Sequence, residues 1–214
     1  KPWEQVKVPH DWAIQGPFDR KWDIQHLAIE QDGQTEAIDH TGRSGALPWI
    51  GEGEYRTTFR LPASAQHAEL YFDGAMSEPV VYVNGREAGR WMYGYNAFRL
   101  DITPFVKAGE NQLRVTLNNR EESSRWYPGA GLYRPVKLIL TGETRIDPWS
   151  TFFRTLSVRQ NTAQLSVDAQ AKARPSASHL RFHIALIDPN GRIAAQKSLP
   201  ADAQGRVSAA LNVS

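Results

Sequence analysis

Short runs of alternating apolar and polar residues recur along the chain, and turn-forming residues separate them. In residues 55–61 the side chains of Tyr55, Phe59 and Leu61 fall on one face of an extended strand. Further runs of this kind occupy residues 70–72, 80–83, 98–102, 113–117 and 136–140. Short strands with turns between them are typical of a β-sandwich or a jelly roll. The sequence therefore predicts an all-β fold.

The dipeptide Asn84-Gly85 follows the run at residues 80–83. Asn and Gly both tolerate a positive φ, as the two central residues of a type I′ turn must, so this pair predicts a β-hairpin.

The β-pattern pauses near Thr141-Gly142-Glu143 and then restarts. Residues 180–186 alternate, residues 188–191 read Asp-Pro-Asn-Gly and indicate a turn, and residues 193–198 and 207–213 give two further strands. We therefore expect a jelly-roll domain over residues 1–143 and an immunoglobulin-like β-sandwich over residues 144–214. An immunoglobulin-type sandwich takes about 100 residues, so we expect the second domain to be incomplete.

Composition excludes several classes of protein. The formal net charge is only +2 and the basic residues are scattered, which argues against nucleic-acid binding. The chain has no cysteine, so it has no disulfide and no thiolate metal site, and it fits either the periplasm or the cytoplasm of a bacterium. No apolar run approaches the roughly 18 residues of a membrane helix. The chain opens in mid-motif at Lys1-Pro2-Trp3-Glu4, so a leader could precede it.

Two motifs combine polar and aromatic residues. In Val8-Pro9-His10-Asp11-Trp12, Asp11 can accept hydrogen bonds from hydroxyls and Trp12 offers a flat apolar wall, a pairing suited to sugars. The alternative is a turn aspartate beside a core tryptophan, and the spacing alone favours this alternative. The second motif, in residues 123–134, joins Arg125 to Trp126 in a loop rich in Pro and Gly. It fits a binding loop or an internal packing loop equally well.

Other candidates carry less weight. Glu52 and Glu54 are two residues apart at the entry to a strand, where paired carboxylates usually face solvent, so we do not expect a catalytic pair there. His179 and His183 share the polar face of a predicted strand, and we expect no metal there. No pattern in the sequence indicates a cofactor.

Together these motifs resemble glycoside hydrolase family 2, the β-galactosidase-like enzymes. The matching stretches are Val8 to Trp12, Gly53 to Phe59, Phe72-Asp73-Gly74, Val83-Asn84-Gly85, Asp101-Ile102-Thr103, Gly109 to Val115 and Gly131 to Val136, in the order of the family. The resemblance implies a jelly-roll sugar-binding domain, then an immunoglobulin-like domain, and then a TIM barrel that carries two catalytic glutamates. The family's acid/base glutamate follows an asparagine, and this sequence has no Asn-Glu pair.

The resemblance implies that the chain is a non-catalytic amino-terminal part of a retaining β-glycosidase. On this view Asp11, Trp12, Arg125 and Trp126 contact a terminal β-galactoside at the rim of the barrel of the same protein. The best-known β-galactosidases have asparagine at the position of Asp11 and an aspartate shortly before the tryptophan that matches Trp126. Homo-oligomer formation by the whole protein stays open.

A second hypothesis is an autonomous carbohydrate-binding module without a catalytic partner. The incomplete second domain favours the enzyme, because a free-standing module would end at a domain boundary. Sugar affinity separates the two: a module binds sugar unaided, whereas loops at the rim of a barrel hardly bind it without the barrel.

Overall fold

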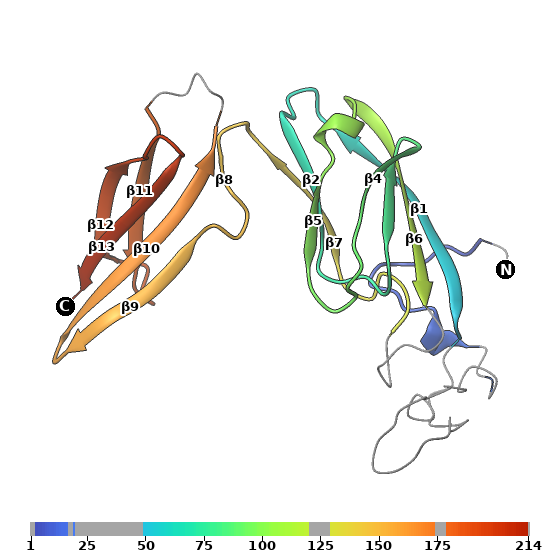
Figure 1. Cartoon of the computed structure of the whole chain (residues 1–214), viewed down its shortest axis with the longest axis horizontal. Coiled ribbons are helices and arrows are strands. Elements are labelled where there is room, and N and C mark those ends of the chain that lie inside the picture. Colours follow the sequence, from blue (N-terminus) through green and yellow to red (C-terminus); the bar gives the residue numbers. More distant parts are fainter. Residues whose placement is uncertain (1–2, 17–18, 20–48, 120–128, 174–178, 214) are drawn as a thin grey trace, which may run out of the picture. The chain divides into compact units, whose positions relative to one another are not determined.

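The computed structural model describes residues 3–16, 19, 49–119, 129–173 and 179–213. The chain divides into two compact units, Lys1–Leu140 and Thr141–Ser214, which are coloured blue to yellow and yellow to red in Figure 1. This division falls close to the predicted boundary after residue 143. The assignment of residues 144–214 to an immunoglobulin-like domain stays a prediction.

The described part of the first unit contains seven strands in two sheets. One sheet has the order β1-β6-β3-β4 and the other has the order β5-β2-β7. The strands are β1 (Gly51–Leu61), β2 (His67–Phe72), β3 (Val80–Val83), β4 (Arg86–Arg90), β5 (Phe98–Asp101), β6 (Gly109–Asn119) and β7 (Val136–Thr141). The chain passes repeatedly from one sheet to the other, as in a jelly roll.

β1 and β6 form the longest ladder of the first sheet. Its antiparallel register runs without a break from the pair Gly51 and Asn119 to the pair Leu61 and Gly109. At the other edge, Asn84 has φ +50° and Gly85 has φ +79°, so the two residues form the predicted hairpin turn between β3 and β4. The Asn84 amide group donates to Phe105 O at 2.9 Å and to Asn111 Oδ1 at 2.8 Å, and this ties the turn to β6 and to the segment that leads into it.

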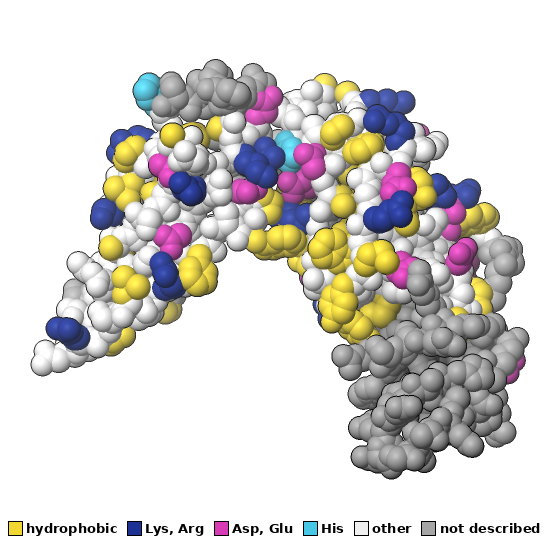
Figure 2. All heavy atoms as spheres, in the orientation of Figure 1, with side chains coloured by type: hydrophobic (Ala, Val, Ile, Leu, Met, Phe, Trp, Pro, Cys, Tyr) yellow, Lys and Arg dark blue, Asp and Glu magenta, His cyan; other side chains and the backbone are white. Residues whose placement is uncertain are grey.

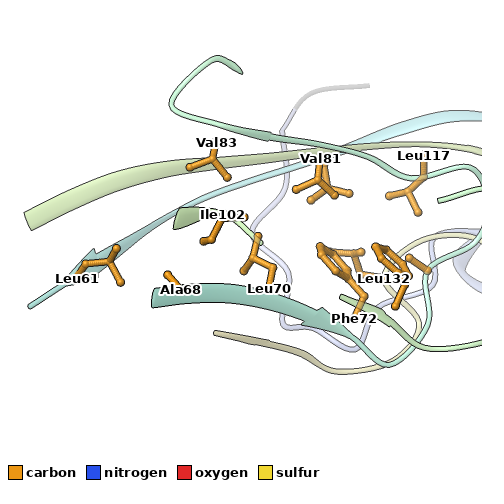
Figure 3. Packing of buried hydrophobic residues seen from close by; sticks show 12 residues of the cluster. Leu61, Ala68, Leu70, Phe72, Val81, Val83, Ile102, Leu117 and Leu132 are labelled. Carbon is orange, nitrogen blue, oxygen red and sulfur yellow. The ribbon is translucent and has the colours of Figure 1, made fainter. Parts of the chain in front are cut away.

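The core of the first unit lies between its two sheets. In Figure 3, Val81, Val83 and Leu117 point from one sheet toward Leu70 and Phe72 of the other. Phe72 is fully buried and stacks on Phe98 with a ring-centroid distance of 4.6 Å. These apolar faces come from alternate positions of each strand, which is the pattern that the sequence predicts.

The described part of the second unit is also built from strands. The strands are β8 (Arg145–Ile146), β9 (Phe152–Arg159), β10 (Thr162–Lys172), β11 (Arg181–Ile187), β12 (Ile193–Pro200) and β13 (Arg206–Val213). β10 pairs with β13, β8 and β9, and β11 pairs with β12, all antiparallel. Leu165, Val167 and Leu211 form its small buried core.

The predicted all-β class is confirmed, because the described helical elements are single 3₁₀ turns, η1 (Ala13–Gln15) and η3 (Thr103–Phe105). The turn at residues 188–191 is also confirmed: Asp188 Oδ1 accepts from the backbone N–H groups of Asn190 and Arg192, both at 2.8 Å. β8, β9 and β10 were not predicted from the sequence.

Replacing Phe72 by alanine tests the core of the first unit. The substitution removes a fully buried ring and its stacking contact with Phe98. We therefore expect Phe72→Ala to lower the free energy of unfolding by about 3–5 kcal/mol. Urea denaturation followed by tryptophan fluorescence measures the change. Tyr93→Ala is the matched control, because Tyr93 is 58% exposed in the same unit and its loss should change stability by no more than about 0.5 kcal/mol. Equal effects of the two substitutions would contradict this packing.

Candidate functional site

Three segments that are distant in sequence meet at one end of the first unit. His10 N donates to Leu132 O at 2.8 Å and Trp12 N donates to Ala130 O at 3.0 Å. On the other side, Met76 and Gly131 exchange a pair of backbone hydrogen bonds of 3.0 and 2.7 Å. The segment 130–132 thus lies between residues 10–12 and the segment around Met76, and it holds both in place.

Gly131 is required at the centre of this arrangement. Its φ of +116° is one that residues with a side chain rarely adopt, and a Cβ there would lie 2.7 Å from the carbonyl oxygen of His10 and against the Tyr55 hydroxyl. The glycine therefore allows the backbones to approach closely enough for the hydrogen bonds on both sides.

Asp11 lies at a turn between this junction and η1. Its Oδ1 accepts a hydrogen bond from Ala13 N at 2.9 Å, two residues further along the chain, as in an Asx turn. Its Oδ2 faces the segment around Gly129, 3.5 Å from the place where a Cβ of Gly129 would stand. The turn role that the sequence offered as an alternative is present, and a role in sugar binding stays a proposal.

Trp12 is partly buried against the first sheet. A Cβ on Gly53 would come within 2.5 Å of its ring, and the ring centroids of Tyr55 and Trp49 lie 6.0 and 6.5 Å away. The packing role that the sequence offered for Trp12 is therefore present. Its indole Nε1 is buried and makes no hydrogen bond to any described residue.

Tyr55 links the junction to β1. Its hydroxyl lies 2.8 Å from His10 Nδ1 and 3.2 Å from His10 O, and it accepts a long hydrogen bond of 3.4 Å from Leu132 N. Burial raises the pKa of Tyr55 to about 12, the hydrogen bond from Leu132 opposes this shift, and the negative charge of Asp11 adds to it. The neutral phenol therefore holds these segments together.

Arg125 and Trp126 lie outside the described residues. Their predicted place beside Asp11 and their role toward a sugar stay predictions.

The other polar candidates have structural explanations. Glu54 forms ion pairs with Arg56 and with Arg114, the latter at 3.5 Å, while Glu52 is exposed. His179 and His183 are exposed, as expected of a polar face. Within the described ranges no group of three or more His, Asp or Glu side chains could hold a metal ion, and no helix is long and apolar enough to cross a membrane.

An apolar hollow of about 920 Å³ lies beneath the amino-terminal segment. Its wall includes Trp12, Trp49 and Tyr55 together with core residues of both sheets. A second hollow, of about 980 Å³, lies in the second unit, and its lining includes Gln170 of β10 and Asp202 of the loop between β12 and β13. Of these two hollows, the first adjoins the junction of three segments, because Trp12 and Leu132 both line it.

The sequence did not single out the loop at residues 91–96, which carries exposed aromatic side chains at the same end of the first unit. Tyr133 in the neighbouring segment donates to Gly94 O at 2.8 Å, so this loop adjoins the junction. An alternating strand does not fit this segment, because its large apolar side chains are nearly consecutive: Trp91, Met92, Tyr93 and Tyr95. That clustering was the signal that could have revealed the loop.

The first unit is a two-sheet jelly roll in which Asp11 and aromatic rings meet at one end, an architecture that fits the class of β-sandwich domains that bind sugars. Residues 42–142 match the family model for the sugar binding domain of glycosyl hydrolases family 2. The chain belongs to glycoside hydrolase family 2.

Relatives named for two activities share this region. A β-galactosidase of Bacteroides ovatus is 37% identical over 77% of this chain and 18% of its own length. A protein of Formosa agariphila, provisionally named a β-glucuronidase, is 31% identical over 92% of this chain and 17% of its own length.

A solved structure of a family 2 member from Bacteroides cellulosilyticus superposes with a TM-score of 0.80 at 27% identity, over 99% of this chain and 27% of that one. The chain thus spans between about a sixth and about a quarter of the length of these relatives.

The raised pKa of Tyr55 predicts a specific loss of stability in alkali. The folded state favours the neutral phenol, so the stabilisation is fully present below the unfolded pKa of about 10 and is lost as the pH rises through about 12. Wild-type protein should therefore lose stability relative to Tyr55→Phe between these two pH values. Urea denaturation at pH 8 and pH 11 measures the difference, and Tyr93→Phe controls for loss of a surface tyrosine hydroxyl. A wild-type to Tyr55→Phe difference that is the same at both pH values would contradict the burial of this hydroxyl.

Proposed function

We propose that this chain is the sugar-binding amino-terminal part of a retaining β-glycosidase that hydrolyses terminal β-galactosides. The observation that carries the proposal is the match of residues 42–142 to the sugar binding domain of family 2, together with the convergence of Asp11 and aromatic rings at one end of that domain. Its role is to present loop residues to a sugar held by a TIM barrel of the same protein.

The geometry of the described carboxylates supports a non-catalytic role for the chain. Retaining hydrolysis uses two carboxyl groups about 5 Å apart, one as nucleophile and one as acid and base. Glu54 is engaged by Arg56 and Arg114, and the buried Glu69 is engaged by His67 at 2.7 Å and by Arg99. These carboxylates neutralise arginines, so we assign the bond-breaking pair to the barrel.

Electrostatics favours a galactoside over a glucuronide at Asp11. A sugar hydroxyl can donate to the carboxylate of Asp11, and a hydrogen bond to a charged group contributes about 1.5–3 kcal/mol. The carboxylate of a glucuronide would meet a like charge there. The β-galactosidase of Bacteroides ovatus has the higher identity and the Formosa agariphila protein matches more of this chain, so the choice of a galactoside rests on the charge of Asp11.

The hydrolytic activity of the purified proteins tests whether the catalytic carboxylates lie in the barrel and whether the substrate is a β-galactoside. We expect the 214-residue chain to leave a chromogenic β-galactoside intact, and the whole protein to hydrolyse it faster than the matching β-glucuronide. Hydrolysis by the 214-residue chain that is abolished by Glu52→Gln or Glu54→Gln would overturn the non-catalytic role. Faster hydrolysis of the glucuronide would overturn the choice of sugar and leave the family assignment intact.

Two substitutions at Asp11 separate sugar contact from turn formation. Asp11→Ala removes both roles, so we expect kcat/KM of the whole protein for the β-galactoside to fall about ten-fold to a hundred-fold, at about 1.4 kcal/mol per factor of ten. The same change should cost about 1 kcal/mol of stability, because Ala13 N loses its acceptor. Arg125→Ala should lower kcat/KM by a similar factor.

Asp11→Asn is the matched variant, because asparagine keeps an acceptor for Ala13 N but carries no charge. We expect it to keep the wild-type melting temperature and to lower kcat/KM for the β-galactoside. If Asp11→Asn has wild-type kcat/KM while Asp11→Ala loses only melting temperature, Asp11 serves the turn alone.

A further inference from the structure

Residues 91–96, in the loop between β4 and β5, expose three aromatic side chains and one methionine, and we call this segment the aromatic loop. The exposed fractions are 36% for Trp91, 65% for Met92, 58% for Tyr93 and 38% for Tyr95. Figure 2 shows hydrophobic side chains gathered in the lower part of the coloured surface of the first unit. A contiguous exposed apolar patch on a folded domain usually marks a binding surface.

The aromatic loop is held in one conformation by contacts along its length. Trp91 stacks on the buried Phe98 with a centroid distance of 5.5 Å and an interplanar angle of 9°, and its Nε1 donates to Asn96 Oδ1 at 2.8 Å. Gly94 O accepts from the Tyr133 hydroxyl at 2.8 Å, and Tyr95 O accepts from Arg134 Nη1 at 3.4 Å. A surface that is already ordered loses little entropy when a ligand binds.

The aromatic loop belongs to the same end of the first unit as Asp11. A Cβ on Gly94 would lie 2.8 Å from the Met76 side chain, and Met76 pairs with Gly131, which also contacts the backbone of His10. A ligand that extends beyond Asp11 could therefore reach the loop without leaving this end of the domain.

The chemistry of the aromatic loop matches a sugar. The rings of Tyr93 and Tyr95 lie with centroids 5.6 Å apart at an interplanar angle of 53°, so they present a bent apolar surface edged by two hydroxyls. A pyranose ring likewise has apolar C–H faces and a rim of hydroxyls, and tyrosine offers an apolar body with a polar tip. Arg134 is exposed beside the loop, and its guanidinium has five N–H donors, more than its two long hydrogen bonds to Asp73 O and Tyr95 O use.

We propose that the aromatic loop and Arg134 form a binding site for the inner sugar units of a β-linked oligosaccharide, distinct from the terminal sugar assigned to Asp11. The sugar rings stack on Tyr93 and Tyr95, and Arg134 donates to their hydroxyls. The choice of a carbohydrate rests on the proposed function. The loop and the residues that support it all lie in the first unit, so the chain alone can bind the inner units of an oligosaccharide. The terminal sugar at Asp11 is different, because its binding needs the barrel; tight binding of methyl β-galactoside by the chain alone would instead indicate an autonomous module.

Titration of the ¹⁵N-labelled 214-residue chain with β-1,4-linked galactotetraose, followed by NMR, tests the site. We expect shift changes centred on residues 91–96 and Arg134, with a dissociation constant in the millimolar range, and much smaller changes with methyl β-galactoside at equal concentration. Tyr93→Ala and Tyr95→Ala should each weaken binding about ten-fold. Phe152→Ala is the matched control, since it removes a 57% exposed ring from the second unit and should leave binding unchanged.

Two results would overturn the proposal. The first is that galactotetraose leaves the resonances of residues 91–96 unmoved, or binds the Tyr93→Ala and Tyr95→Ala variants as well as wild type. The second is that the loop resonances depend on protein concentration and Tyr93→Ala removes this dependence, which would identify a second copy of the chain as the occupant. Turnover by the whole protein is a separate measurement, so the glycosidase proposal and the oligosaccharide site can fail independently.

Discussion

The end of this domain that carries Asp11 depends on the backbone hydrogen bonds of residues 130–132. One edge of this segment binds His10 and Trp12, and the other binds Met76. Buried backbone groups must find partners, so a short segment with partners on both edges fixes two otherwise independent chain segments. Only glycine at position 131 allows these backbones to come so close. The position of Asp11, the packing of Trp12 and the placement of the aromatic loop all follow from this junction.

The jelly roll supports this junction without supplying its chemistry. Its two sheets enclose an apolar core around Phe72 and Phe98, and Trp91 stacks on the same Phe98. The aromatic loop, which is the proposed binding surface, thus rests on the core through Trp91. Loops that a β-scaffold holds in this way commonly carry recognition, whereas catalysis of glycoside cleavage needs a carboxylate pair that we assign elsewhere.

The sequence predicted elements whose residues obey a strong local rule. The turns at Asn84-Gly85 and at residues 188–191 follow from residues that tolerate positive φ or accept backbone hydrogen bonds. β9 was missed because Phe152 and Phe153 break the alternation, and all eight of its residues are exposed. The junction could not be predicted at all, because nothing local in Gly131 or Met76 indicates a partner about 55 residues away in the chain.

The two oxygens of Asp11 allow one residue to serve both the turn and the proposed sugar contact. Oδ1 is committed to Ala13 N, and this bond fixes the side-chain rotamer. Oδ2 then faces the segment around Gly129 in an orientation that the first bond has already set. An asparagine could form the same turn, since its amide oxygen replaces Oδ1, and would then present an NH₂ donor in place of the second oxygen. The turn therefore tolerates either residue, and under the proposed function the choice between them decides whether this position accepts hydrogen bonds from a sugar or donates them.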